Sequence, residues 1–261
     1  MIAARARLTT PWIMIALLTG LAGPATAIGG TVYWNAGTAG GGGNLSPSST
    51  TDAPSWVSVG PMSRGNNYGQ SSEVFNNFTS ASNSYSFALN GSNTPASGSY
   101  NFGVNTVVGA LLDTATTSYV SFTITPTSGL NFELLSIGFG TRSTANGPQA
   151  WALRSSLDGF STDLASGSLS NNSAWSYKTA SLGTPLWSSA ATELRIYGYA
   201  VDPTQSPLST TWRLDDVQVG IVPEPSAVLL LAIGAGSAAI AGGWRRARSR
   251  RRLSREKVTA S

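Results

Sequence analysis

Between residues 28 and 221 the chain consists of short runs in which apolar and polar residues alternate, and this pattern limits the fold more than any other feature. In the run VSFTI at 120–124, for example, every second residue is apolar. A period of two is that of a β-strand with one face in the core and one in water. Gly, Ser, Asn and Pro separate the runs. The pattern therefore predicts an all-β domain of two antiparallel sheets packed face to face.

The same reading gives the individual elements. Strands are expected at 32–34, 56–59, 73–78, 85–89, 100–104, 107–112, 120–124, 132–139, 151–155, 174–179, 194–199 and 217–221. The Gly-rich segment 37–51 has too little apolar surface to order itself and is predicted to be a mobile loop. The pair Asp158-Gly159 between two apolar runs predicts a tight hairpin turn.

Cysteine and histidine are both absent from the 261 residues. No disulfide can hold the fold together, so burial of apolar surface must do so, and no thiol can act as nucleophile or metal ligand. The lack of histidine excludes a Ser-His-Asp arrangement and nearly every catalytic zinc site. The composition therefore favours a protein without catalytic machinery.

The positive charge of the chain lies at its ends. The whole chain has a formal net charge of +4, yet residues 28–221 contain six basic and ten acidic residues, a net charge of −4. A domain of that sign repels a phosphate backbone, and no basic stripe with interleaved aromatics is visible. We therefore expect no nucleic-acid partner.

Residues 1–27 have the three parts of a secretory signal peptide. Arg5 and Arg7 precede a short apolar core at 12–21, and the sequence ATA at 25–27 is a small-x-small cleavage site. The prediction is an exported protein whose domain begins at residue 28.

The chain closes with an apolar run and a basic tail. The twenty residues 225–244 carry no charge, which is long enough to cross a hydrocarbon core of roughly 30 Å as a helix. We expect a transmembrane helix at 227–244 and a cytoplasmic tail at 245–261, with the domain on the opposite side of the membrane. The basic residues that set this orientation are Arg245, Arg246, Arg248, Arg250, Arg251 and Arg252.

A proline-rich motif stands directly before this run. It consists of Val222, Pro223, Glu224, Pro225 and Ser226. The two prolines oppose a helix, so 222–226 is expected to be extended and exposed. The order of motif, apolar span and Arg cluster at the C-terminus resembles the PEP-CTERM sorting signal. An ordinary single-pass anchor with a proline juncture is the alternative.

The resemblance implies a specific partner. In that family an exosortase, a membrane-embedded cysteine transpeptidase of bacteria that make exopolysaccharide, recognises the motif and processes the protein. It implies a precursor anchored in the inner membrane and a mature protein at the cell surface or outside the cell. The motif residues would then serve recognition rather than catalysis.

Two stretches, 153–164 and 211–219, resemble strands of discoidin and carbohydrate-binding jelly-roll domains. The likeness implies a jelly-roll-like sandwich and, at Asp215, an oxygen ligand for a structural Ca²⁺. Asp215 and Asp216 are neighbours in one expected strand, so their side chains should point to opposite faces. An exposed acid that accepts hydrogen bonds from loop amides is the alternative reading; no other cofactor is expected.

Tryptophans supply the candidates for ligand binding. Trp151 and Trp212 lie in strand-like runs and are predicted to be buried, whereas Trp175 and Trp187 lie near loops and are predicted surface residues that could stack on sugar rings. The sequence thus predicts a non-catalytic protein of the cell surface or extracellular matrix. The alternatives are a glycan-binding module of the exopolysaccharide matrix and, third, a glycoside hydrolase that uses two carboxylates from residues such as Glu73, Glu133 and Glu193.

Overall fold

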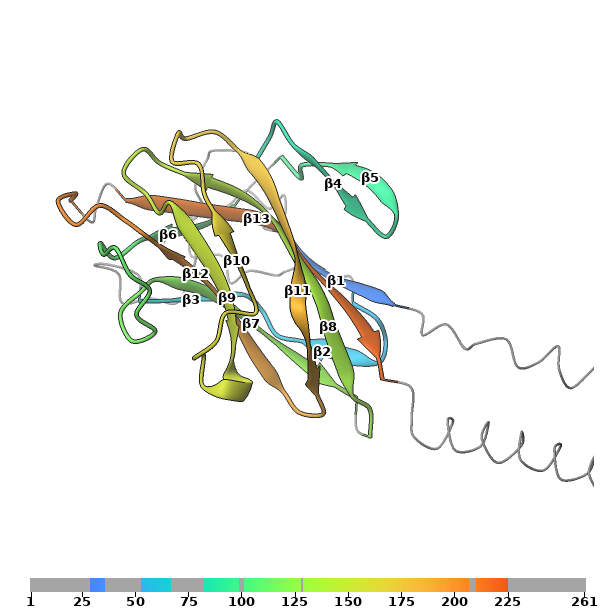
Figure 1. Ribbon diagram of the computed structural model, residues 1–261. Coiled ribbons are helices and arrows are strands. Elements are labelled where there is room, and N and C mark those ends of the chain that lie inside the picture. Colours follow the sequence, from blue (N-terminus) through green and yellow to red (C-terminus); the bar gives the residue numbers. More distant parts are fainter. Residues whose placement is uncertain are drawn as a thin grey trace, which may run out of the picture. The chain divides into compact units, whose positions relative to one another are not determined.

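Strands pair into two antiparallel sheets and a separate hairpin (Figure 1). The computed structural model describes residues 29–35, 53–66, 82–98, 101–127, 129–206 and 210–224. The strands of these residues are β1 (Gly30–Trp34), β2 (Val57–Val59), β3 (Ser63–Gly65), β4 (Ser86–Leu89), β5 (Ser92–Pro95), β6 (Phe102–Asn105), β7 (Tyr119–Pro126), β8 (Phe132–Ser143), β9 (Ala150–Ser155), β10 (Ala165–Ser168), β11 (Ser176–Ser188), β12 (Thr192–Tyr199) and β13 (Thr211–Pro223).

The five-stranded sheet, called sheet A, has the order β1-β13-β8-β11. Its central strand β13 pairs with β8 along most of its length, and on the other side with β6 at its start and β1 towards its end. The register with β8 is interrupted between Asp215 and Gln218 by one additional residue on β13, a β-bulge. The last strand of the described residues therefore lies in the middle of sheet A.

The six-stranded sheet, called sheet B, has the order β10-β9-β12-β7-β2, and β3 pairs with β7 as well. Leu194 and Ile196 of β12 are fully buried between the sheets, whereas Arg195 between them points to the outer face and remains partly exposed. This alternation agrees with the sequence pattern.

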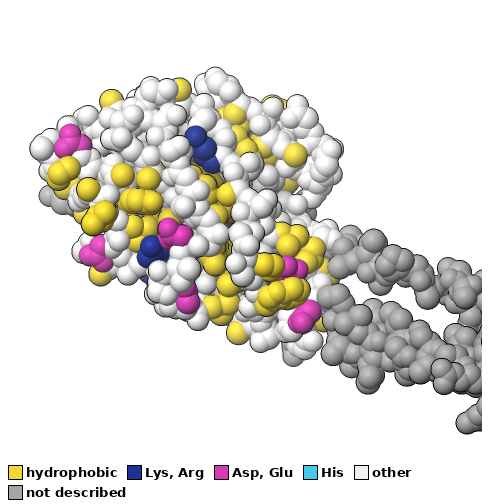
Figure 2. Space-filling model, in the orientation of Figure 1, with side chains coloured by type: hydrophobic (Ala, Val, Ile, Leu, Met, Phe, Trp, Pro, Cys, Tyr) yellow, Lys and Arg dark blue, Asp and Glu magenta, His cyan; other side chains and the backbone are white. Residues whose placement is uncertain are grey.

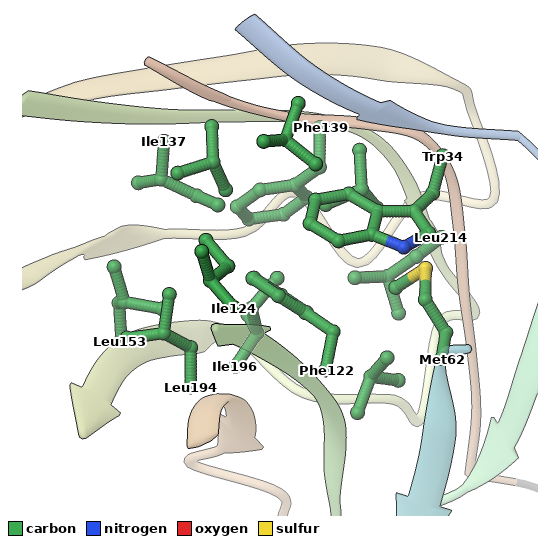
Figure 3. Close-up of a cluster of buried hydrophobic side chains, with 14 of the residues drawn as sticks. Trp34, Met62, Phe122, Ile124, Ile137, Phe139, Leu153, Leu194, Ile196 and Leu214 are labelled. Carbon is green, nitrogen blue, oxygen red and sulfur yellow. The ribbon is translucent and has the colours of Figure 1, made fainter. Parts of the chain in front are cut away.

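Aromatic pairs join the two sheets in a single hydrophobic core (Figure 3). Trp34 of sheet A packs on Phe122 of sheet B with ring centroids 4.5 Å apart. Phe139 of sheet A meets Trp151 of sheet B edge to face, at 5.0 Å. The Trp34 indole also donates a hydrogen bond to the Gly60 carbonyl, at 3.2 Å. The predicted β-sandwich with a shared core is confirmed.

Strands with a clear apolar alternation match the prediction, and strands without one were missed. β3, β5 and β10 have the sequences SRG, SNTP and ASGS. They are held by backbone pairing with a neighbouring strand rather than by an apolar face. The expected strand at 73–78 and the expected loop at 37–51 both lie outside the described residues.

Two local predictions are wrong. The apolar run 107–112 forms no strand; only Gly109 pairs, in an isolated bridge with Val201. Asp158-Gly159 is not a tight hairpin turn, because a 3-10 helix at Ser156–Asp158 begins a longer connection between β9 and β10. The Asp158 carboxylate accepts hydrogen bonds from Ser161 and from the Thr162 amide, which favours this wider loop.

The compact unit that contains the sandwich spans Ile28–Glu224. Its end lies three residues beyond the predicted domain boundary at 221. No helix able to cross a bilayer occurs in the part of the chain that the structure describes. The predicted signal peptide 1–27, the span 227–244 and the tail 245–261 lie outside that part.

Candidate functional site

The end of β13 contains the first part of the predicted sorting motif. Val222 is paired with Glu133 and Pro223 with Phe132, both on β8. The Glu224 amide donates to the Asn131 carbonyl at 3.1 Å, and the Asn131 side-chain amide donates to the Glu224 carboxylate. Val222 and Pro223 are half-buried and only Glu224 is exposed.

The prediction that 222–226 is an extended and exposed segment is thus wrong for its first two residues. Their backbone is extended, but it belongs to sheet A because β8 continues to Phe132 and offers a pairing partner. Pro225, Ser226 and the arginines from Arg245 to Arg252 lie outside the described residues.

The bulge in β13 corrects the expectation for Asp215 and Asp216. Both side chains are fully buried and both accept hydrogen bonds from Ser97, so they lie on the same outer face of sheet A. The reason is the additional residue at the bulge, where Asp216 adopts a left-handed backbone with φ 48°. Leu214 before and Val217 after the pair both enter the core.

Each carboxylate is surrounded by donors. Asp215 accepts from the Ser82 and Ser97 hydroxyls, both at 2.7 Å, and from the Asp216 amide at 2.9 Å. Asp216 accepts from the Tyr33 hydroxyl at 2.5 Å, the Tyr85 hydroxyl at 2.6 Å and the Ser97 amide at 3.1 Å. These bonds satisfy the oxygen atoms of two buried carboxyl groups, whose burial would otherwise be costly.

The tyrosines in this arrangement stay protonated. Burial raises the pKa of Tyr33 and of Tyr85 well above the ordinary 10.0, and the nearby Asp216 carboxylate raises both further. A neutral hydroxyl is the form that can donate to a carboxylate. The arrangement is therefore a structural one, in which Asp215 and Asp216 fix the segments that carry Ser82, Tyr85 and Ser97.

A Ca²⁺ ion at Asp215 would need further oxygen ligands. Within the described residues, no group of three or more His, Cys, Asp and Glu side chains is placed to hold a metal ion. The oxygen atoms of Asp215 instead accept hydrogen bonds from the Ser82 and Ser97 hydroxyls and the Asp216 amide. The calcium hypothesis stays a prediction without support from this geometry.

Hairpin β4–β5 covers the outer face of sheet A next to these aspartates. Phe87 of the hairpin stacks on Tyr33 at 5.9 Å and on Tyr177 at 5.0 Å between ring centroids. Tyr85 lies so close to β8 that a Cβ at Gly140 would be 2.0 Å from its hydroxyl. The hairpin thus forms a second, smaller aromatic cluster outside the main core.

Trp175 belongs to this cluster and is not a surface residue. Its ring lies 6.2 Å from that of Tyr85, and its side chain is 8% exposed. The surface prediction for Trp175 is therefore wrong, because the hairpin that covers it comes from a distant part of the sequence. Trp151 and Trp212 are buried as predicted.

Trp187 is exposed as predicted, at 46%. It is paired with Glu133 of β8, and on the other side of Glu133 lies Val222. Leu135, which neither neighbouring strand pairs because the register shifts at this point, is 40% exposed. Figure 2 shows hydrophobic side chains with acidic ones beside them over the ends of β8 and β11.

A second candidate surface lies on the outer face of sheet B. The Arg195 guanidinium is held between the Phe160 ring at 3.8 Å and the Tyr119 ring at 4.3 Å. It donates to Glu193 at 2.8 Å, and the Tyr119 and Tyr197 rings are 5.3 Å apart. We call these five residues the Arg195 cluster.

The backbone of Phe160 and the hydrogen bonds of Arg195 both favour the contacts within this cluster. Phe160 has a φ of 62°, which is unfavourable for an aromatic residue, and its contact with Arg195 offsets that strain. Burial lowers the pKa of Arg195, but hydrogen bonds to Glu193 and Tyr197 outweigh it and raise the pKa above its ordinary value. Sequence reasoning missed the cluster, since Phe160 reaches Arg195 only through the unexpected loop after β9.

Comparison with known proteins does not assign the chain to a family. No family model matches the chain, and no curated protein matches it. Among solved structures, it is similar to the K3 cleaved adhesin domain of Lys-gingipain from Porphyromonas gingivalis, with 12% identity, 50% of this chain and 79% of that chain covered, and a TM-score of 0.28.

Two further solved structures have comparable similarity. One is a CBM36-1 domain of a multidomain xylanase from the hindgut metagenome of Trinervitermes trinervoides, with 12% identity, 55% and 89% of the two chains covered, and a TM-score of 0.27. The other is the enzymatically active domain of tailspike protein 4 of bacteriophage CBA120, with 12% identity, 64% and 20% covered, and a TM-score of 0.33. Similarities of this size carry no argument about what this chain does.

Proposed function

We propose that this chain is an exported, non-catalytic protein of the bacterial cell surface or extracellular matrix, processed by an exosortase at its C-terminal signal. The observation that carries the proposal is where the compact unit ends. That unit closes at Glu224, inside the Pro-Glu-Pro motif, and in the sequence the apolar run and the Arg-rich tail follow directly. A folded cargo followed in the sequence by an apolar run and a basic tail is the organisation that such processing needs.

The use of the acidic residues supports a role without catalysis. Asp215 and Asp216 are the adjacent acids of the domain, and hydroxyl and amide donors occupy both carboxylates in a fully buried position. A general acid or base must reach its substrate. These two residues serve the fold.

The test is to transfer residues 222–261 to an inert exported reporter protein. In a host with an exosortase, we expect the reporter at the cell exterior, with an intact mass that ends near the motif. In a host without the enzyme, it should remain in the inner membrane at full mass. A reporter that stays uncleaved in both hosts would overturn the sorting proposal.

The Arg195 cluster favours a second candidate function, binding of a glycan from the exopolysaccharide matrix. It combines the partly exposed rings of Tyr119 and Phe160 with an arginine and a glutamate. Rings of this kind stack on sugar C–H faces, while charged groups bond to hydroxyls. The exposed Trp187 on the outer face of sheet A offers a separate aromatic surface.

Affinity electrophoresis in gels that contain the host polysaccharide tests this candidate. We expect Tyr119→Ala to abolish retardation and Trp187→Ala to leave it unchanged, since Trp187 lies on the other sheet. If the native protein is not retarded, glycan binding is excluded and only the structural role remains. The glycoside hydrolase alternative instead requires hydrolysis that Glu133→Gln or Glu193→Gln removes.

A further inference from the structure

The sorting motif begins inside a strand that is part of the folded sandwich. β13 ends at Pro223, and Figure 1 shows this end beside β8. Beyond the strand, Glu224 is bound to Asn131 through its backbone amide and through its carboxylate. The first half of the motif is therefore bound to the same domain that cleavage at the motif would release.

Such a position conflicts with recognition by a processing enzyme. Enzymes of this kind bind their substrate as an extended segment, whose backbone groups must be free to pair with the enzyme. The groups of residues 222–224 that face β8 already have partners. Phe132, opposite Pro223, is fully buried, so the motif cannot be approached from that side.

The pairing of β13 shows how many residues must detach from the sheet to free the motif. β1 pairs with β13 only up to Ile221, so Val222 and the residues after it are held by β8 and the Asn131 contacts. Ile221 itself is 1% exposed and belongs to the core. Detachment of 222–224 thus breaks few bonds and stops at Ile221, which is a local opening of the kind that folded proteins undergo.

We propose that the sandwich controls its own processing: residues 222–224 must detach from β8 before the exosortase can bind, so that local opening at the end of β13 limits the rate of cleavage. This inference rests on the proposed sorting function. In this proposal, the contact between Asn131 and Glu224 has a regulatory role in addition to a structural one.

A reversible cross-link tests the proposal in the full chain. Glu133→Cys with Val222→Cys places two cysteines at paired positions of adjacent antiparallel strands, a separation that a disulfide can span. The chain has no cysteine of its own. In a host with an exosortase, we expect the oxidised precursor to be processed at least about ten-fold more slowly than the same variant under reductant.

Two comparisons separate this effect from others. The pair Ala88→Cys and Asn93→Cys cross-links hairpin β4–β5, far from the motif in the chain, and should leave the processing rate unchanged. Asn131→Ala removes a bond to Glu224 without altering the motif, and should accelerate processing about two- to five-fold. Because the reduced form of the first pair carries both substitutions, it reports their direct effect on recognition.

The outcomes discriminate between the two proposals. Equal rates for the oxidised and reduced forms would overturn the gating and leave the sorting function standing. No processing of the native chain in the equipped host would overturn both. Hydrogen exchange on the native chain gives a readout without the enzyme: we expect the Glu224 amide to exchange slowly, and exchange at the rate of an unfolded peptide would contradict the gating.

Discussion

Asp216 shows how one residue links distant segments of this chain. Its carboxylate joins β13 to Tyr33 of β1, and to Tyr85 and Ser97 on either side of hairpin β4–β5. Its left-handed backbone creates the bulge that turns both aspartates outward. Asn adopts this conformation readily, so Asp216→Asn replaces the carboxyl group by an amide with little added strain.

We expect Asp216→Asn to lower the free energy of unfolding by about 1–3 kcal/mol, since neutral acceptors form weaker hydrogen bonds than a carboxylate. Asp216→Ala should cost more, about 3–5 kcal/mol, because it leaves two buried hydroxyls and an amide without an acceptor and adds backbone strain. Urea unfolding followed by tryptophan fluorescence measures both. Equal losses would show that an amide at position 216 stabilises the fold no more than a side chain without any acceptor.

Buried tyrosines make the stability of the fold sensitive to alkaline pH. Burial raises the pKa values of Tyr33, Tyr85 and Tyr177 above the 10.0 of free tyrosine, so above about pH 10 the folded chain holds protons that the unfolded chain releases. Stability should therefore be constant with respect to these groups below pH 10 and fall as the pH rises beyond it.

Urea unfolding between about pH 8 and 11 checks this dependence, and Tyr177→Phe is the matched variant. It retains the ring that stacks on Phe87 and removes one titrating hydroxyl, so the decline above pH 10 should be less steep. A decline of unchanged steepness would exclude Tyr177 as a source of it.

At the scale of elements, hairpin β4–β5 is a separate layer attached to the sandwich. Its contacts are the aromatic cluster around Phe87 and the bonds of Tyr85 and Ser97 to the aspartates. The main core, which contains Phe122, does not include any residue of the hairpin. The hairpin should therefore open without unfolding of the two sheets.

Phe87→Ala tests this independence. We expect rapid hydrogen exchange in the hairpin amides and a small change in the global free energy of unfolding, because the stacking partners Tyr33 and Tyr177 remain attached to sheet A. Phe122→Ala, in the main core, should lower the global stability by about 3–5 kcal/mol. If Phe87→Ala lowered it as much, the hairpin would belong to the same cooperative unit.

Sequence patterns were sufficient where burial depends on local alternation and failed where it depends on distant segments. The fully buried Trp212 lies in an alternating run and was predicted correctly. Trp175 was not, since Tyr85, which packs against it, lies ninety residues earlier in the chain. For the bulge a local signal was present: Leu214 and Val217 are three positions apart, which breaks the period of two. The Arg195 cluster had no such signal.

At the scale of the whole molecule, processing should reverse the sign of the charge. The full chain has an isoelectric point of about 9.6, yet residues 28–221 contain six basic and ten acidic residues. We expect the mature protein recovered from the cell exterior to focus well below pH 7, and the precursor to focus above pH 9. A mature form that is still basic would mean that the Arg-rich tail is retained.

The central place of β13 has a consequence for the order of events during export. Sheet A is divided until this last strand arrives, because β1 and β8 both pair with it and do not pair with each other. Five residues of β13 also fill the core: Trp212, Leu214, Val217, Val219 and Ile221. A chain that emerges from a translocation channel N-terminus first cannot complete its sandwich until nearly all of the domain has passed through. On the proposed route of export, the polypeptide should therefore cross the membrane unfolded and close its core at the last step of the passage.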